Sequence, residues 1–170
     1  MTATIPSQHT AQHHYETRID LAAEVRSPVI NILSQTLAST LDLKTQTKQA
    51  HWNVKGPHFI QLHELFDQLA GELEDYVDMV AERITALGGT ALGTARIAAS
   101  ESILPEYPLT ISDGQAHVAA LAERFAAYGK HVRSAIDQTD TLGDADTADL
   151  YTEISRTIDK RLWFLEAHLA

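Results

Sequence analysis

Five side chains in the stretch from His51 to Glu82 are of the types that bind transition metals, two histidines and three carboxylates: His51, His63, Asp67, Asp78 and Glu82. Imidazole nitrogen donors favour iron, manganese or zinc over magnesium and calcium. A carboxylate-rich site holds ferric iron well and leaves coordination positions open for an oxidant, so iron is the leading candidate, with zinc as a competitor. The expected chemistry is metal-assisted oxidation. Trp52, beside His51, is a candidate electron donor.

One long amphipathic helix is predicted to carry four of these five side chains. Apolar residues recur at spacings of three and four from Phe59 to Leu87, which is the pattern of a helix with one core face. At about 100° per residue, the four ligand-type side chains on this helix fall within an arc of roughly 100° beside that face: His63, Asp67, Asp78 and Glu82. His51 ends the preceding helix, and a turn over residues 53–57 is expected to fold it back beside His63.

The spacing along this helix predicts that one chain cannot close the site. Asp67 and Asp78 are separated by roughly 16 Å of helix at about 1.5 Å per residue, whereas metal–ligand bonds are about 2 Å long. In an antiparallel pair of helices, the His63 and Asp67 of one copy would face the Asp78 and Glu82 of the other. The two-fold axis would cross near Gly71, where the small residues Ala70 and Gly71 favour close approach, and each dimer would hold two identical sites.

The rest of the chain fits a single helical domain, because 170 residues with 44% apolar side chains suffice for one sizeable core. We expect a first helix with Ser27 as N-cap and Pro28 in its first position. The second helix should end at Gly88 and Gly89. A long connection over residues 90–111, with a short helix near residues 94–99, lets the third helix run parallel to the second.

Two further boundaries are predicted from capping residues. Ser112 or Asp113 should cap the third helix. An acidic turn over residues 137–149 should precede the last helix, with its aspartates as N-caps or as compensation for the helix dipole.

The runs KQAHWNVKGPHFIQLHELFD and DMVAERITALGG resemble the Dps family, small ferritin-like proteins of starved bacterial cells, and DKRLWFLEAHL resembles the family's last helix. The resemblance implies an all-α fold: a ferritin-like four-helix bundle, over residues 19–170, with a short extra helix in the connection between helices 2 and 3. It implies a homo-oligomer of 12 subunits forming a hollow shell.

The activity implied by the resemblance is that of a ferroxidase at the two-fold interfaces. It would oxidise Fe(II), preferably with hydrogen peroxide, store the ferric mineral and limit oxidative damage. His51, His63 and Asp67 match the family's iron ligands from one subunit, Asp78 and Glu82 match those from its partner, and Trp52 matches the adjacent tryptophan. A resemblance to shell-forming ferritin-like proteins also suggests a pore that draws in ferrous ions, lined by Asp140, Asp144, Asp146 and Asp149.

Residues 1–18 are expected to form a flexible polar tail, in which His9, His13 and His14 have no assigned role. Some family members bind DNA through basic tails. This tail lacks a cluster of lysines or arginines, and the formal net charge is −10, so contacts that release counterions from phosphates are not expected. The absence of cysteine is compatible with a reducing cytoplasm, and no signal peptide or membrane span is indicated.

Two alternatives to a ferroxidase remain open from the sequence. One is a nucleoid-binding protein, and the other is a structural oligomer that holds zinc at the same interface without turnover. No Glu-x-x-His motif occurs anywhere in the chain, which disfavours a di-iron centre inside one subunit.

Overall fold

The computed structural model describes residues 15–170, so residues 1–14, including His9, His13, His14 and most of the expected tail, lie outside the described part. Four long helices make up the bundle: α1 (Ala23–Asn53), α2 (Phe59–Ala86), α4 (Gly114–Leu142) and α5 (Ala145–Glu166). A short helix, α3 (Ala95–Glu101), lies in the connection between α2 and α4. The predicted all-α fold is confirmed, and α3 begins within a residue of the expected position.

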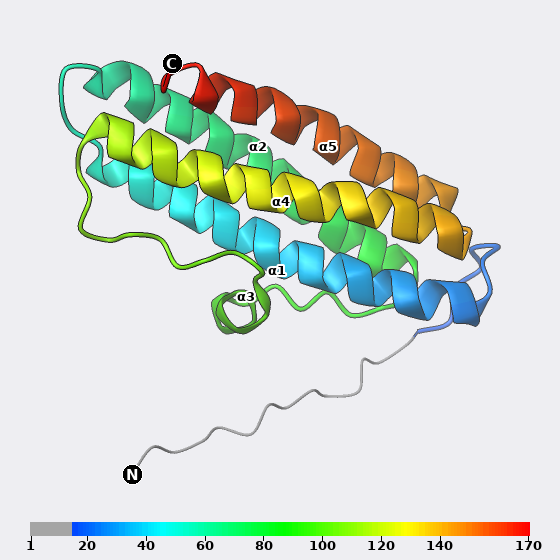
Figure 1. Ribbon diagram of the computed structural model, residues 1–170. Helices are drawn as coiled ribbons and strands as arrows, with labels where there is room; N and C mark the ends of the chain where they lie inside the picture. Colours follow the sequence, from blue (N-terminus) through cyan, green and yellow to red (C-terminus); the bar gives the residue numbers. More distant parts are fainter. Residues whose placement is uncertain (1–14) are drawn as a thin grey trace, which may run out of the picture.

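The long connection determines the topology. α1 and α2 are antiparallel, as are α4 and α5, and the connection through α3 crosses the length of the bundle so that α4 runs in the same direction as α2 (Figure 1). α1 packs on α2, α4 packs on α5, and the two pairs also meet through α1 and α4. The parallel arrangement of the second and third long helices is thus confirmed.

The middle of the bundle contains hydroxyl groups as well as apolar side chains. The hydroxyl of Tyr151 lies 2.8 Å from the Thr36 Oγ1, and that of Tyr128 lies 2.6 Å from the Thr40 Oγ1. Both tyrosines are completely buried. Pairs of neutral hydroxyl groups that hydrogen-bond each other therefore lie in the middle of the bundle.

The predicted start of the first helix is wrong. α1 begins four residues before Ser27, with Ala22 as N-cap, and Pro28 lies inside the helix. The extra turn is anchored by Arg26, which donates hydrogen bonds to the carbonyls of Leu21 (3.1 Å) and Leu87 (2.8 Å). These contacts tie the start of α1 to the end of α2. They compensate for the helix hydrogen bond that is missing at Pro28, whose nitrogen carries no proton to donate.

The end of α2 is as predicted. Gly88 has φ +88°, in the left-handed region, and a Cβ there would lie 2.4 Å from the Tyr15 carbonyl oxygen. The Gly88 and Gly89 amides donate to the carbonyls of Thr85 and Ile84, each at 2.9 Å. Only glycine accommodates both the conformation and the crowding, so α2 ends here.

The predicted acidic turn is mostly helix. α4 continues to Leu142, which places Asp137 and Asp140 in its last turns, and only Gly143 and Asp144 separate it from α5. Gly143, at φ +91°, gives the left-handed C-cap that makes so short a turn feasible. Asp113 caps α4 and Asp144 caps α5, as the sequence suggested.

Candidate metal centre

His51 and His63 form a stacked pair where the end of α1 meets the start of α2. Their ring centroids are 3.8 Å apart and their planes differ by 19°. The Nδ1 of His51 lies 2.7 Å from the carbonyl oxygen of His63, and the Nδ1 of His63 lies 2.8 Å from that of His51. Because a carbonyl oxygen only accepts, each Nδ1 carries the proton. In the neutral rings both Nε2 atoms therefore keep their lone pairs for a metal ion.

Asp67, one turn after His63, brings a carboxylate to the same place. Its Oδ1 lies 3.9 Å from the His51 Nε2. A hydrogen bond from Lys48 to Asp67, at 2.6 Å, holds the pKa of this carboxyl below its usual value; burial opposes the shift, and the charge of Lys48 adds to it. Asp67 is thus ionised at neutral pH and suited to bind a cation. We call His51, His63 and Asp67 the histidine half-site.

Asp78 and Glu82 lie further along the same helix and are exposed. We call them the carboxylate half-site. Eleven residues of helix, or roughly 16 Å, separate Asp78 from Asp67. Within residues 15–170 of a single chain, no group of three or more histidine, cysteine, aspartate or glutamate side chains is arranged to hold a metal ion. The chain carries two incomplete sets of ligands on one helix.

Exposed apolar side chains lie near the histidine half-site in the sequence. Trp52 is 66% exposed, Ile60 51% and Phe59 43%, and the Phe59 ring lies 5.0 Å from that of His63. Large aromatic side chains left in water beside a cluster of ligand-type groups are typical of a surface that is covered in an assembly. The exposed Phe59, beside His63, and Trp52, beside Lys48, therefore mark the surroundings of the histidine half-site as a candidate contact surface.

The small residues near the expected two-fold axis differ in their environment. Ala70 is only 4% exposed and packs within its own bundle, so the prediction that it faces another copy is wrong. Its position on the helix borders the core face, which α1 covers. Gly71 is exposed, and a Cβ built there meets nothing within 4 Å. Of these two residues, Gly71 is the one that leaves room on the helix surface for the predicted close approach.

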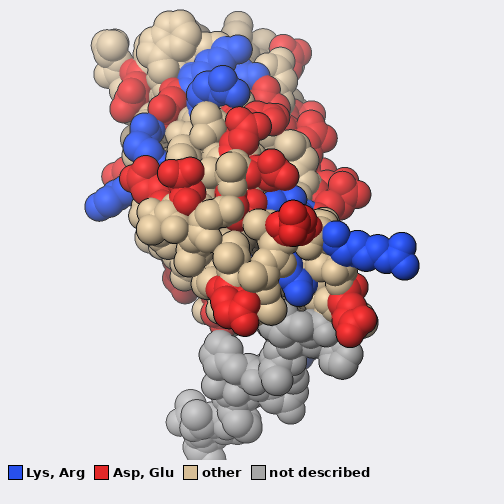
Figure 2. All heavy atoms as spheres, turned by 90° about the vertical axis from the view of Figure 1, so that its right-hand side faces the viewer, with Lys and Arg blue, Asp and Glu red and all other residues tan. Residues whose placement is uncertain are grey.

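The aspartates expected to line a pore lie at the end of the bundle where α4 ends and α5 begins. Figure 2 shows several acidic side chains on this end of the molecule. Asp140, Asp146 and Asp149 are exposed. Asp144 is not: it is 1% exposed and accepts hydrogen bonds from Arg83 Nη2 (2.7 Å) and from the Thr147 amide (3.0 Å). Asp144 therefore acts as an N-cap and ion-pair partner.

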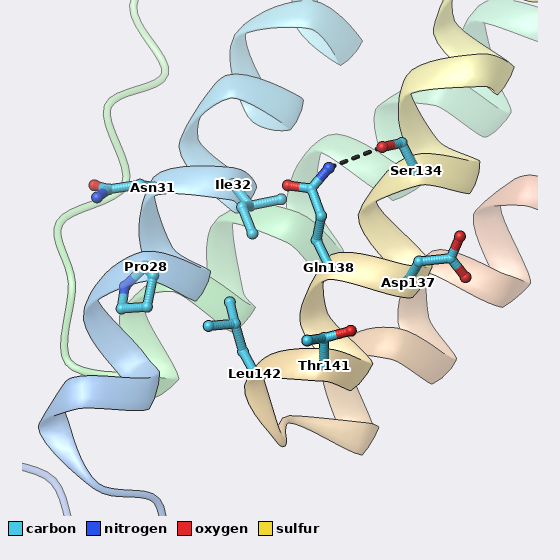
Figure 3. A pocket seen from close by; sticks show the side chains of 8 residues that line it. All are labelled: Pro28, Asn31, Ile32, Ser134, Asp137, Gln138, Thr141 and Leu142. Carbon is cyan, nitrogen blue, oxygen red and sulfur yellow. Dashed lines mark hydrogen bonds between the residues drawn. The ribbon is translucent and has the colours of Figure 1, made fainter.

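A groove of about 600 Å³ between α1 and α4 lies away from the histidine half-site, and Figure 3 shows the side chains that line it. It is lined by Pro28, Asn31, Ile32, Ser134, Asp137, Gln138, Thr141 and Leu142. Ile32 precedes His51 by nineteen residues of one helix, or about 28 Å. Asp137 is the only titratable side chain among the lining residues, so the groove offers little for catalysis.

Lys48 is a feature of the site that the sequence reasoning missed. It precedes His51 by three residues and Trp52 by four, which are the spacings of neighbours on one helical face. That spacing was a signal available from the sequence.

No described helix is both long and apolar enough to cross a membrane.

Comparisons with known proteins agree on one family. The model of the ferritin-like domain matches residues 30–170. The chain is 47% identical over 155 residues to the DNA protection during starvation protein of Agrobacterium fabrum, covering 91% of this chain and 96% of the relative. Among solved structures, DpsA14 from Streptomyces coelicolor superposes with a TM-score of 0.88 at 34% identity, covering 93% of this chain and 94% of that one.

A second solved structure, Mycobacterium smegmatis Dps in a tetragonal crystal form, gives a TM-score of 0.86 at 32% identity. It covers 91% of this chain and 93% of the other.

Proposed function

Because the chain belongs to the Dps family of ferritin-like proteins, we propose that it oxidises Fe(II) at sites shared between two copies and stores the ferric product in a hollow shell. One observation carries the proposal. The histidine half-site presents the proton-free Nε2 atoms of His51, at the end of α1, and His63, on α2, together with the ionised carboxylate of Asp67. The carboxylate half-site lies further along α2, too distant to complete the site. A second copy supplies the missing half.

In the proposed dimer, two α2 helices cross antiparallel near Gly71. His51, His63 and Asp67 of one copy then face Asp78 and Glu82 of the other, and the contact forms two identical sites. Two nitrogen and three carboxylate donors suit a transition metal, and Fe(II) is the substrate. The exposed Trp52, Phe59 and Ile60 would be covered in the same contact.

The reaction we propose consumes hydrogen peroxide. Two Fe(II) ions and one peroxide molecule, with two protons, give two Fe(III) ions and two water molecules. Hydrogen peroxide is the oxidant, and the anionic carboxylates favour the trivalent product over the divalent substrate, which makes bound Fe(II) easier to oxidise. Trp52, beside His51, would supply an electron when only one Fe(II) is available. Using up both Fe(II) and peroxide limits the formation of hydroxyl radicals.

The larger assembly is also part of the proposal. Twelve copies would enclose the mineral, with residues 19–170 as the bundle and the preceding residues as a polar tail, in the cytoplasm. Asp140, Asp146 and Asp149 would line the entry route for Fe(II). The Agrobacterium relative is named for DNA protection. Removal of iron and peroxide protects DNA without binding it, and the net charge of −10 agrees with protection of that kind.

A mixed assembly tests the shared site. One variant carries His51→Ala and His63→Ala, and the other carries Asp78→Asn and Glu82→Gln. Neither variant alone retains both halves of any site, so each should lose rapid ferric formation after anaerobic Fe(II) loading and peroxide addition. In a one-to-one mixed assembly, one site in four combines two intact halves, so about one quarter of the wild-type rate should return.

Three outcomes would contradict the proposal. A mixed assembly as inactive as its parents would show that the site is not shared between copies. If the parent variants formed ferric iron at the wild-type rate, the oxidation would have to occur at other residues. A wild-type particle that binds zinc but oxidises Fe(II) no faster than buffer would favour the structural zinc oligomer. Particle mass, recorded throughout, establishes that each variant still assembles.

A further inference from the structure

Lys48 already places a cation in the histidine half-site. Its ammonium group lies 2.6 Å from the Asp67 Oδ1 and 5.7 Å from the centre of the Trp52 ring. Its side chain is 29% exposed, and that of Asp67 is 57% exposed. The ammonium is thus shared between one candidate ligand and the aromatic side chain next to another.

The oxygen that Lys48 contacts is also the one that lies near the His51 Nε2. Two donors bound to one ion at about 2 Å and near-tetrahedral or octahedral angles are roughly 3 to 3.5 Å apart. The His51 Nε2 and the Asp67 Oδ1 are 3.9 Å apart, so a small movement brings both onto one ion. That ion would then lie within a few ångströms of the Lys48 ammonium, and the two positive charges would repel each other.

We propose that Lys48 is a positioning residue and resident counter-cation, so that metal binding in the histidine half-site is an exchange of one cation for another. In the metal-free protein it holds Asp67 beside His51. When a divalent ion takes the Asp67 Oδ1, the ammonium withdraws towards the face of Trp52, where a cation–π contact is available. The inference rests on the proposed function, since it takes the histidine half-site as the place where metal binds.

Lys44 provides a matched control. It makes an ion pair with Glu74 that parallels the one between Lys48 and Asp67, from α1 to α2, and its side chain is 25% exposed. Glu74 is not among the candidate ligands. Lys44→Met and Lys48→Met remove the same charge from the same helix, one turn apart, and methionine keeps most of the apolar stem.

The test is titration of the assembled full-length protein with Co(II), which binds similar donors and reports them through its visible absorption. Lys48→Met should tighten Co(II) binding about five- to tenfold, because the ion no longer displaces a cation. Lys44→Met should change the dissociation constant less than about twofold, because Lys44 pairs with Glu74 and not with a candidate ligand, and interactions between charges near the surface are screened. Thermal unfolding of both variants, measured alongside, separates stability from affinity.

A second readout follows the ammonium itself. In a Trp163→Phe background, Trp52 is the remaining tryptophan, and its emission should change on addition of zinc as the cation moves over the ring. Lys48→Met should abolish that change, whereas Lys44→Met should preserve it. A purely structural lysine would not link zinc binding to Trp52 emission.

The outcomes separate this inference from the proposed function. If Co(II) binds and the binding depends on His51 and His63, but Lys48→Met equals Lys44→Met or weakens binding, the exchange is wrong and the shared metal site stands. If wild-type protein binds no Co(II), or binds it equally after both histidines are replaced, the histidine half-site is wrong and both proposals fail.

Discussion

At the residue scale, backbone carbonyls fix which ring nitrogen His51 and His63 can each offer to a metal ion. His51 and His63 exchange hydrogen bonds, each Nδ1 donating to the other's carbonyl oxygen, and this exchange fixes both tautomers and the stacking of the rings. A histidine with an unconstrained ring would present either nitrogen. Here the lone pairs are on Nε2 before any metal arrives, which lowers the reorganisation that binding requires.

Asp144 shows that an aspartate in an acidic stretch of sequence can be buried and paired in the structure. Asp144→Ala removes the buried partner of Arg83 and the cap of α5 together, and should destabilise the fold by about 3 kcal/mol. Asp146→Ala, which alters an exposed aspartate two residues on, should change stability by less than about 0.5 kcal/mol. Thermal or urea unfolding of the two variants measures the difference, and equal effects would contradict the buried role of Asp144.

At the element scale, α2 is the organising helix. Its buried stripe packs in the bundle, while His63, Asp67, Asp78 and Glu82 share a flank outside that stripe. Glycine in the middle of such a helix is unfavourable on its own. The exposed Gly71 lies on that flank, midway between the two half-sites, which is understandable if another helix passes close to it.

Substitutions at Gly71 distinguish the free helix from the assembled one. Gly71→Ala adds a Cβ that meets nothing within 4 Å in the single chain, and should favour the helix by about 0.5–1 kcal/mol. Gly71→Arg keeps helix propensity but fills the space at the proposed axis, so it should prevent dimers and larger particles. Native mass measurement or ultracentrifugation reports both, and normal assembly of Gly71→Arg would place the axis elsewhere.

At the scale of the whole molecule, a single chain has its own hydrophobic core but, under the proposed function, holds only half of each metal site. The bundle has a continuous core, whereas its candidate ligands remain in two half-sites and large apolar side chains stay exposed beside one of them. The proposed chemistry therefore needs two copies, although the hydrophobic core lies within one.

Two histidines outside the half-sites make the stability of the bundle depend on pH. Burial lowers the pKa of His131, whose Nε2 lies 2.9 Å from the Thr36 Oγ1, below the ordinary 6.5. Burial likewise lowers the pKa of His117, partly opposed by the carbonyls of Asn53 and Ile111. Below pH 6.5 the unfolded chain therefore binds protons that the folded chain does not, and stability falls as the pH drops towards the lower, folded-state pKa values.

The corresponding measurement compares melting temperatures at about pH 7.5 and about pH 5.5. His131→Gln cannot be protonated and its amide can still hydrogen-bond the Thr36 hydroxyl, so its melting temperature should fall less on acidification than that of the wild type. His58→Gln, at an exposed position, should follow the wild type. An unchanged slope in His131→Gln would show that the bundle does not depend on a neutral His131.

Much of this molecule was predictable because its signals are local. The amphipathic period, the glycines after Leu87 and the capping Asp113 predicted α2 and the start of α4 correctly. The errors lie at helix ends, one of them set by a contact with a distant segment and the other by an unusually short turn. α1 begins early because Arg26 reaches the end of α2, and α4 continues through Asp137 and Asp140 because the turn to α5 needs only Gly143 and Asp144.

The sequence alone determined the fold class, the flank that carries the candidate ligands and the distance that separates them, since helical geometry converts spacing in sequence directly into direction and length. Only the tertiary structure decided which nitrogen each histidine presents and that Lys48 donates a hydrogen bond to Asp67. It also decided that Ala70 is buried and that Asp144 pairs with Arg83. Each of these depends on a contact between different helices, and periodicity within one helix carries no information about the side chains of another.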